Sequence, residues 1–288
     1  MPSTLDIRRR IRSVKNTAQI TKAMQMVAAS KMRKSQGAAL SGRPYQEALF
    51  RVLAALRGKV DSQASPLLVE RTVRRELILV ISSDKGLCGA LNTNLFRELT
   101  AIDAVDPSFI AIGRKAVQFL IRTRRNLLAD FQVSEIPHTR EVRPIANFCA
   151  ERFLSGEVDR VRVVYSKFVN TLIQQATTVN LLPASSEELL GEEKEEKGEK
   201  LASGEFLFEP SERGVLSAIV PHYITFQIYQ MILDARASEH SARMVAMKNA
   251  TDNAKQLVKD LTLHYNKVRQ ASITTELLEI ASAQLSVG

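Results

Sequence analysis

One short stretch of the sequence has residue types that could do chemistry: Ser82-Ser-Asp-Lys-Gly-Leu-Cys-Gly89. It follows an apolar run that predicts a buried strand and precedes a predicted helix, which is where α/β domains usually bind nucleotides. It matches neither G-x-G-x-x-G nor the P-loop pattern, because Lys85 precedes its glycine. We therefore interpret the stretch as a structural turn. A nucleotide-dependent enzyme stays as an alternative, and binding or turnover of a nucleotide by the isolated chain tests it.

Few other side chains in the sequence could act as a nucleophile, a base or a metal ligand. Cys88 beside Lys85 could be a thiol of low pKa, but no histidine lies near it in sequence to act as its base. Two cysteines, Cys88 and Cys149, are too few for a disulfide framework, and we interpret both as small buried hydrophobic residues. No Ser/His/Asp or paired-carboxylate arrangement stands out, so the sequence predicts no catalytic residue, no cofactor and no enzyme activity of its own. Metal-ligand spacing is missing among the four histidines, which are His138, His222, His240 and His264.

Charge is spread unevenly along the 288 residues, whose formal net charge is +9. Residues 1–34 contain nine Lys or Arg against Asp6 alone, whereas residues 187–200 contain seven Glu against three Lys. A basic arm indicates nucleic acid, a membrane surface or an acidic protein as partner. A basic coiled-coil protein that binds nucleic acid is thus a second alternative, which predicts affinity that falls steeply with salt. The longest apolar runs, such as residues 77–81, are too short to span a bilayer, and no secretory signal is predicted.

The element that dominates the chain is a predicted helix from about Arg243 to Leu285, without proline or glycine. Its apolar and small residues recur at alternating steps of three and four, which is the period of a coiled-coil seam. Ala, Ser and Thr hold many seam positions, so the helix buries little apolar area and needs partner helices. The predicted seam comprises Met247, Ala250, Ala254, Leu257, Leu261, His264, Val268, Ala271, Thr275, Leu278, Ser282 and Leu285.

A second long helix is predicted at the start of the chain, capped by Ser3 or Thr4. It continues to about Leu56, with a bend near Gly42 and Pro44. Two long helices with narrow seams are expected to pair in antiparallel orientation. The predicted seam of the first helix comprises Ile7, Ile11, Val14, Ala18, Thr21, Gln25, Ala28 and Met32.

Between these helices, short apolar runs alternate with helical segments, which predicts a small doubly wound α/β domain. The three predicted parts are a coiled-coil helix at 1–58, the α/β domain at 72–205 and a coiled-coil helix at 211–288 that pairs with 1–58. A charged loop is expected at 183–203 and a helix kink near Pro221. Strands are predicted at 76–81, 109–112, 127–133, 161–168 and 176–182, and helices at 92–104, 116–123 and 145–154.

Four longer motifs make the sequence specific. They are NTAQITKAMQMVAASKMRK at 16–34, SDKGLCG at 83–89, ARMVAMKNATDN at 242–253 and YNKVRQASITTEL at 265–277. In this order, and over nearly the full chain, they resemble the gamma subunit of F-type ATP synthase of the bacterial type. The resemblance implies a Rossmann-like α/β domain inserted between two terminal helices that form an antiparallel coiled coil. It also implies a non-catalytic rotor shaft, or central stalk, which couples ion-driven rotation of the c-ring to ATP synthesis or hydrolysis at alpha/beta catalytic sites.

The resemblance also implies partners and contact residues. The partners are the alpha and beta subunits of the catalytic hexamer, the epsilon subunit and the c-ring, with no nucleic acid. The location is the cytoplasmic side of the bacterial inner membrane, peripheral to it. Phe206 and Glu209 fall in the segment that touches the c-ring or epsilon. Contact with alpha and beta is implied for Lys22, Met24, Arg33, Lys34, Arg243, Gln270, Thr274 and Glu276.

Overall fold

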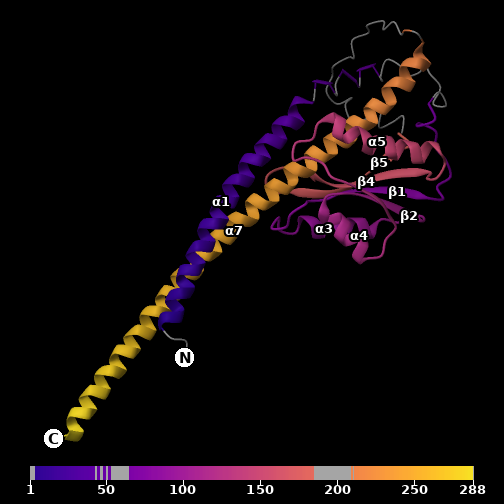
Figure 1. Ribbon diagram of the computed structural model, residues 1–288. Coiled ribbons are helices and arrows are strands. Elements are labelled where there is room, and N and C mark those ends of the chain that lie inside the picture. The colour runs from indigo at the N-terminus through magenta and orange to yellow at the C-terminus, as the bar shows by residue number, and fades with distance from the viewer. Residues whose placement is uncertain are drawn as a thin grey trace. The chain divides into compact units, whose positions relative to one another are not determined.

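The computed structural model divides the chain into two compact units, which we describe separately (Figure 1). The helical unit comprises Met1–Ala29 and Arg243–Gly288, and the sheet unit comprises Ser30–Ala242. The structure describes residues 4–42, 44–45, 48–49, 51–52, 65–184, 209 and 211–287, without the side chains of 212, 279, 281 and 283–287.

Two long helices form the helical unit. Helix α1 spans Thr4–Ser41 and helix α7 spans Glu212–Val287, and each contributes one end to this unit. The two helices lie side by side and run in opposite directions (Figure 1). The prediction of long terminal helices packed against each other is confirmed.

The seam of α1 agrees with the predicted pattern at every position. Its members are buried or half-buried, whereas the neighbouring Ile20, Met26 and Val27 are exposed. The seam is polar near its middle, where the hydroxyl groups of Thr21 and Thr251 share a hydrogen bond of 2.7 Å. Two short side chains that bond to each other let the helix backbones approach closely without leaving a buried hydroxyl unpaired.

The seam of α7 agrees with the prediction at Met247, Ala250, Ala254, Leu261 and Val268, which are buried or half-buried, whereas the predicted Ala271, Thr275, Leu278 and Ser282 are exposed. The predicted Leu257 and His264 are exposed, and the adjacent Val258 and Tyr265 are half-buried in their place. Each observed residue lies one position after the predicted one. Leu257 and Val258 are both apolar, so the apolar pattern of the sequence fits a seam through either residue. The observed seam comprises Met247, Thr251, Ala254, Val258, Leu261, Tyr265 and Val268.

The sheet unit contains a mixed five-stranded sheet in the order β3-β2-β1-β4-β5. Strands β1 to β4 are parallel to one another, and β5 is antiparallel to β4. The central strand β1 is buried along its whole length, which explains its continuous apolar run. The strands are β1 Glu76–Ile81, β2 Pro107–Ile112, β3 Leu127–Phe131, β4 Arg160–Phe168 and β5 Gln174–Leu182.

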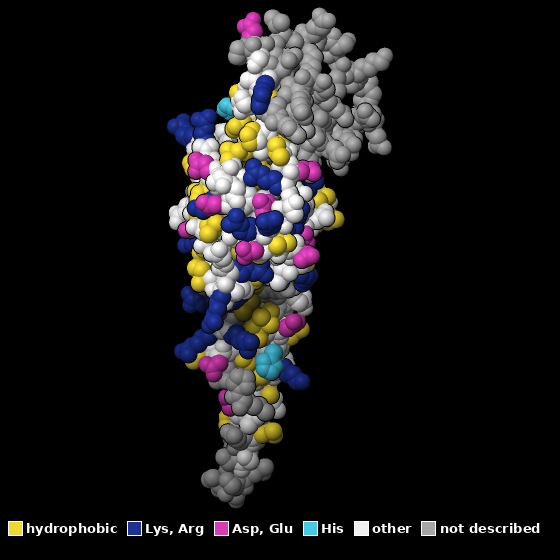
Figure 2. Space-filling view, turned by 90° about the vertical axis from the view of Figure 1, so that its right-hand side faces the viewer, with side chains coloured by type: hydrophobic (Ala, Val, Ile, Leu, Met, Phe, Trp, Pro, Cys, Tyr) yellow, Lys and Arg dark blue, Asp and Glu magenta, His cyan; other side chains and the backbone are white. Residues whose placement is uncertain are grey.

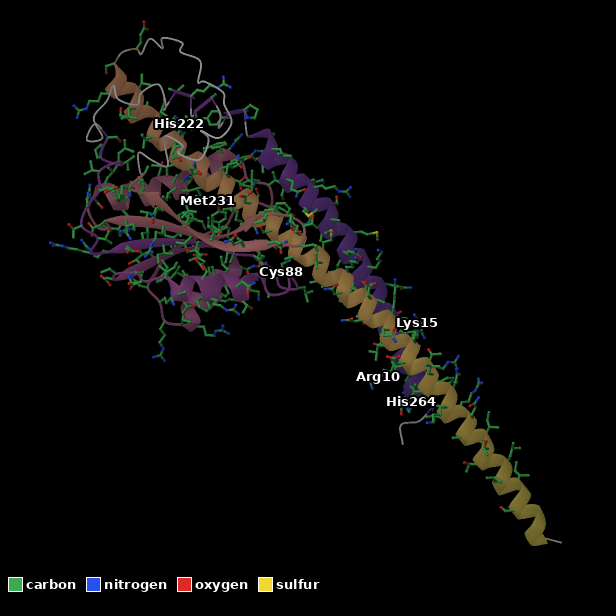
Figure 3. All side chains as sticks on the ribbon, turned by 180° about the vertical axis from the view of Figure 1, so that it is seen from behind. Arg10, Lys15, Cys88, His222, Met231 and His264 are labelled. Carbon is green, nitrogen blue, oxygen red and sulfur yellow. The ribbon has the colours of Figure 1, made fainter. Side chains whose placement is uncertain are left out.

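Helices cover both faces of this sheet, as the doubly wound prediction requires (Figure 1). One face packs against α3 (Leu91–Ala101) and α4 (Arg114–Arg122). The other face packs against α5 (Thr139–Leu154) and the first part of α7, in a core that includes Met231 (Figure 3). Both cysteines are buried within this unit, as predicted.

Helix α5 begins six residues before its predicted start at Ile145, and Pro144 lies inside it. The Glu141 side chain accepts a hydrogen bond of 3.1 Å from the backbone N–H of His138, which closes the first turn. Backbone hydrogen bonds from His138 and Ser134 hold the pKa of Glu141 below its usual value. This local capping outweighs the sequence signal of the proline, which is tolerated best near the start of a helix.

Because the seam is narrow, a larger side chain at a seam position should lower the stability of the helical unit. Ala28 is 2% exposed, so Ala28→Leu should destabilise the helical unit by about 1–3 kcal/mol through overpacking. Thermal unfolding followed by far-ultraviolet circular dichroism measures the effect. The matched control is Val27→Leu, because Val27 is 55% exposed on the same helix turn. Equal melting curves for the two variants would contradict this account of the seam.

A second prediction concerns the close approach of β1 and β2 at their carboxyl ends. Gly113 has φ of +93°, and a Cβ added there would lie 2.3 Å from the carbonyl oxygen of Ser82. Gly113→Ala should therefore destabilise the sheet unit by at least about 1–3 kcal/mol. Gly86→Ala is the control, since a Cβ there meets no atom within 4 Å. Urea unfolding compares them, and a Gly113 variant as stable as the Gly86 variant would refute the prediction.

Candidate functional site

The far end of α7 is the first candidate site, because no described part of the helical unit covers it. Val268 is the last residue of the seam, and the described side chains from Arg269 onward are all exposed. About 19 residues follow Val268 in the helix, which corresponds to roughly 28 Å of axial length. Large apolar side chains are exposed on and just before this end, at Leu263, Ile273, Leu277, Leu278 and Ile280.

A basic surface adjoins this end. Arg8, Arg9, Arg10 and Lys15 of α1 are exposed, and Lys and Arg side chains project around the lower, helical part of the molecule in Figure 2. Figure 3 labels Arg10, Lys15 and His264 in the same region of the helical unit. The arrangement can attract acidic groups, and it contains no constellation for bond-making chemistry.

The predicted contact residues occupy two levels of the helical unit. Met24 is half-buried close to Thr21, and Arg243 is half-buried on α7. Gln270 lies 19 positions beyond Thr251, the seam partner of Thr21, and thus roughly 28 Å further along the axis.

The structure describes the other predicted contact residues except Phe206. Thr274 and Glu276 are exposed, and the Thr274 hydroxyl donates to the Gln270 carbonyl at 2.9 Å. Glu209 is exposed, and Phe206 lies outside the described residues. Lys22, Arg33 and Lys34 are exposed on α1.

The second candidate site is the edge of the sheet at the carboxyl ends of the parallel strands. The turn 82–89 lies here and is bonded mainly to its own neighbourhood. The Ser82 hydroxyl accepts a hydrogen bond of 2.8 Å from the backbone N–H of Ala116. The Asn92 amide donates to the hydroxyl of Ser83 at 2.8 Å and to the sulfur of Cys88 at 3.3 Å. Thus the groups that suggested a nucleophile or phosphate cradle instead hold the turn together.

Helix α7 fills the same edge with its own polar side chains. The Arg236 guanidinium donates to Asp84 of the turn and to the carbonyl of Val133 after β3. Hydroxyl groups of α7 donate to the β4–β5 hairpin, from Ser238 to the carbonyl of Ser166 at 2.9 Å and from Ser241 to Thr171 at 2.7 Å. Doubly wound domains bind their ligands at this edge. In this chain, the edge serves as an attachment surface for a helix.

A carboxylate completes this attachment. Glu135 forms ion pairs with Lys31 of α1 and with His240 of α7, whose Nε2 lies 2.8 Å from it. Burial acts to raise the pKa of Glu135, but the hydrogen bond from Lys31 and the charges of His240, Lys31 and Arg236 outweigh it, so this pKa lies below its usual value.

Our sequence reasoning missed these residues. A signal was present, because Arg236, Glu239 and His240 have the spacing of one helix face, i, i+3 and i+4. All three are buried. Arg236 and His240 also have partners in distant segments, and a single sequence gives no indication of those pairings.

The lowered pKa of Glu135 predicts a pH dependence. A carboxylate whose pKa is lower in the folded state stabilises the fold above its unfolded pKa of about 4.3, and this contribution is lost as the pH falls through the folded value. Glu135→Gln should thus lower the free energy of unfolding by up to about 1 kcal/mol at neutral pH, since the group is partly exposed. Near pH 3, the difference from the unmodified chain should shrink. Urea titrations at both pH values measure it, and a difference that is independent of pH would contradict the assignment.

The fold and these surfaces define a class: a protein of two long terminal helices with an inserted α/β domain, whose usual ligand edge is occupied by its own helix. The family model described as ATP synthase matches residues 3–287. The ATP synthase gamma chain of Opitutus terrae is 49% identical, with 99% of each chain aligned. That of Methylacidiphilum infernorum is 47% identical over 100% of both chains. The chain therefore belongs to the ATP synthase gamma chain family, the non-catalytic central-stalk subunit of F-type ATP synthases, which serve ATP synthesis and proton transport.

Solved structures agree with this assignment. A chain in the structure of the Tetrahymena thermophila mitochondrial ATP synthase central stalk and c-ring is 25% identical, with a TM-score of 0.59, and 80% of this chain and 99% of that chain are covered. A chain of the Euglena gracilis mitochondrial ATP synthase has the same fold, with 20% identity, a TM-score of 0.69 and coverage of 99% and 94%. Within the ranges that the structure describes, no helix has both the length and the apolar content needed to cross a bilayer.

Proposed function

We propose that the chain turns as the rotor shaft inside a hexamer of alpha and beta subunits, with the uncovered end of α7 held in the central opening of that hexamer. The observation that carries this proposal is the exposed end of α7 beyond Val268. In proteins most helical stability comes from tertiary packing of an apolar face, and the described residues of this chain provide no such packing for this end. The exposed Ile273, Leu277 and Leu278 add apolar surface that a surrounding partner would remove from water.

Two levels of contact follow from the positions of the predicted residues. Gln270, Thr274 and Glu276 are exposed on the uncovered end and are available to bind alpha and beta subunits. Met24 and Arg243 are half-buried, so a partner at their level contacts only part of each side chain. Exposed Lys22, Arg33 and Lys34 on α1 suit acidic loops of that partner. Polar contacts of this kind break and reform more easily than a large apolar interface does.

The remaining assignments of the proposal concern the other end of the shaft. The segment with Phe206 and Glu209 contacts the c-ring or the epsilon subunit, at the cytoplasmic side of the bacterial inner membrane. The basic N-terminal helix binds acidic protein groups and does not bind nucleic acid. In this proposal the inserted α/β domain is 72–205, and the terminal segments 1–58 and 211–288 contain the two long helices that pair with each other. The related Tetrahymena and Euglena structures are of assemblies that include a c-ring, which supports this placement.

Reconstitution tests the proposal. The purified chain is mixed with alpha and beta subunits, and gel filtration, subunit ratio and ATPase rate are measured together. One copy per hexamer and an ATPase rate above that of the hexamer alone are expected. A chain that elutes alone and leaves the rate unchanged would refute the proposal.

A single substitution on the uncovered end sharpens this test. Leu278 is 65% exposed, so Leu278→Glu should change the stability of the isolated chain by no more than about 0.5 kcal/mol. A carboxylate enclosed by the hexamer loses water, which costs several kcal/mol without a partner. Incorporation should thus weaken by at least about tenfold. Ile121→Glu on α4 is the control, because Ile121 is 63% exposed on the sheet unit. Equal incorporation of both variants would contradict the placement of α7.

A further inference from the structure

Helix α7 contacts the α/β domain through two different kinds of surface. Over its first part, apolar side chains such as Val220, Ile228 and Ile232 pack into the core beneath the sheet. Hydrophobic burial is strong but has no preferred direction. An apolar helix face resists removal from the sheet more than it resists rotation about the helix axis.

The second surface is polar and directional. Arg236 has a side chain only 7% exposed and donates to Glu239, to Asp84 and to the Val133 carbonyl at 3.1, 3.1 and 3.3 Å. Hydrogen bonds between charged groups are strong, and they weaken steeply when their angle changes. The guanidinium is a rigid planar fork, so three acceptors in different directions determine its orientation.

These bonds reach segments that are far apart in sequence. Asp84 belongs to the turn after β1 and Val133 to the loop after β3, so one α7 side chain holds two strand ends. Glu135 in the second loop also pairs with His240, one helical turn after Arg236. A rotation of α7 about its axis would break the bonds of both side chains together.

We propose that Arg236 is a positioning residue that fixes the rotational setting of α7 against the α/β domain, so that torque applied to the domain turns the helix instead of slipping past it. The inference rests on the proposed function, in which the α/β domain receives torque from the c-ring side. Arg236 makes no contact with a substrate in this role and acts only through the helix that it orients.

The test uses substitutions in the assembled complex. Arg236→Met alone leaves the buried carboxylate of Glu239 without its cation, which is strongly destabilising. The main variant therefore combines Arg236→Met with Glu239→Gln. It removes both charges of the pair and keeps side chains of similar volume. Arg236→Lys is the conservative variant, because it keeps the charge but loses the planar fork. Arg143→Met is the matched control, since Arg143 is an exposed arginine on α5.

Two quantities are measured, starting from membrane vesicles that contain the complete complex. The first is ATP hydrolysis by the catalytic part after its release from the membrane, where the shaft turns without load. The second is the number of protons pumped per ATP hydrolysed, where the shaft turns against load. For the double variant, unloaded hydrolysis should stay at the unmodified rate, whereas the pumping ratio should fall by roughly twofold or more. Arg236→Lys should restore part of the ratio, and Arg143→Met should leave both quantities unchanged.

Two results would overturn the inference. One is a double variant whose pumping ratio equals that of the unmodified complex. The other is a loss of hydrolysis and pumping in equal proportion, which indicates a fold or assembly defect alone. The proposed function fails separately, if the unmodified chain does not assemble with the hexamer or does not support coupled pumping at all.

Discussion

A helix of 76 residues must obtain its neighbours from different parts of the chain, and the structure of α7 follows from this constraint. Within the sheet unit, the helix packs apolar residues such as Ile224 and Ile232 into the core. Within the helical unit, it presents a narrow seam to α1 up to Val268. Beyond that residue, every described side chain is exposed. The sequence of α7 changes accordingly from large apolar residues to small and polar ones.

The small residues of the seam determine how the helical unit is held together. Ala28 and Ala254 are buried but remove little apolar area from water, so packing alone stabilises this unit weakly. The hydrogen bond between Thr21 and Thr251 adds a specific contact, which favours one register of the two helices over its neighbours. A thin helical pair with few exposed apolar side chains on α1 has a surface that can move against a surrounding protein.

Much of the fold was predictable because local patterns and tertiary packing agree. The limits of β1 were predicted as observed, since a strand buried on both faces reads as a nearly continuous apolar run, here residues 77–81 after Glu76. The start of α5 was missed, because the capping by Glu141 depends on a loop conformation. The phase of the α7 seam was missed between Leu257 and Val258, where adjacent apolar residues make both phases plausible. The phase of the seam depends on contacts with α1, and the start of α5 depends on the conformation of the loop before it.

The site was less predictable than the fold. The order of long motifs identified the family, but the surroundings of Arg236 and His240 became visible only when distant segments were placed together. The turn 82–89 shows why: its Ser, Lys and Cys residues suggest chemistry, yet its Asp84 accepts a hydrogen bond from Arg236 of α7.

In a doubly wound domain, the carboxyl edge of the strands can bind a protein segment instead of a small ligand. In this chain, a helix with an arginine, two serines and a histidine takes that place. The edge that other proteins use for binding nucleotides thereby joins the domain to the stalk.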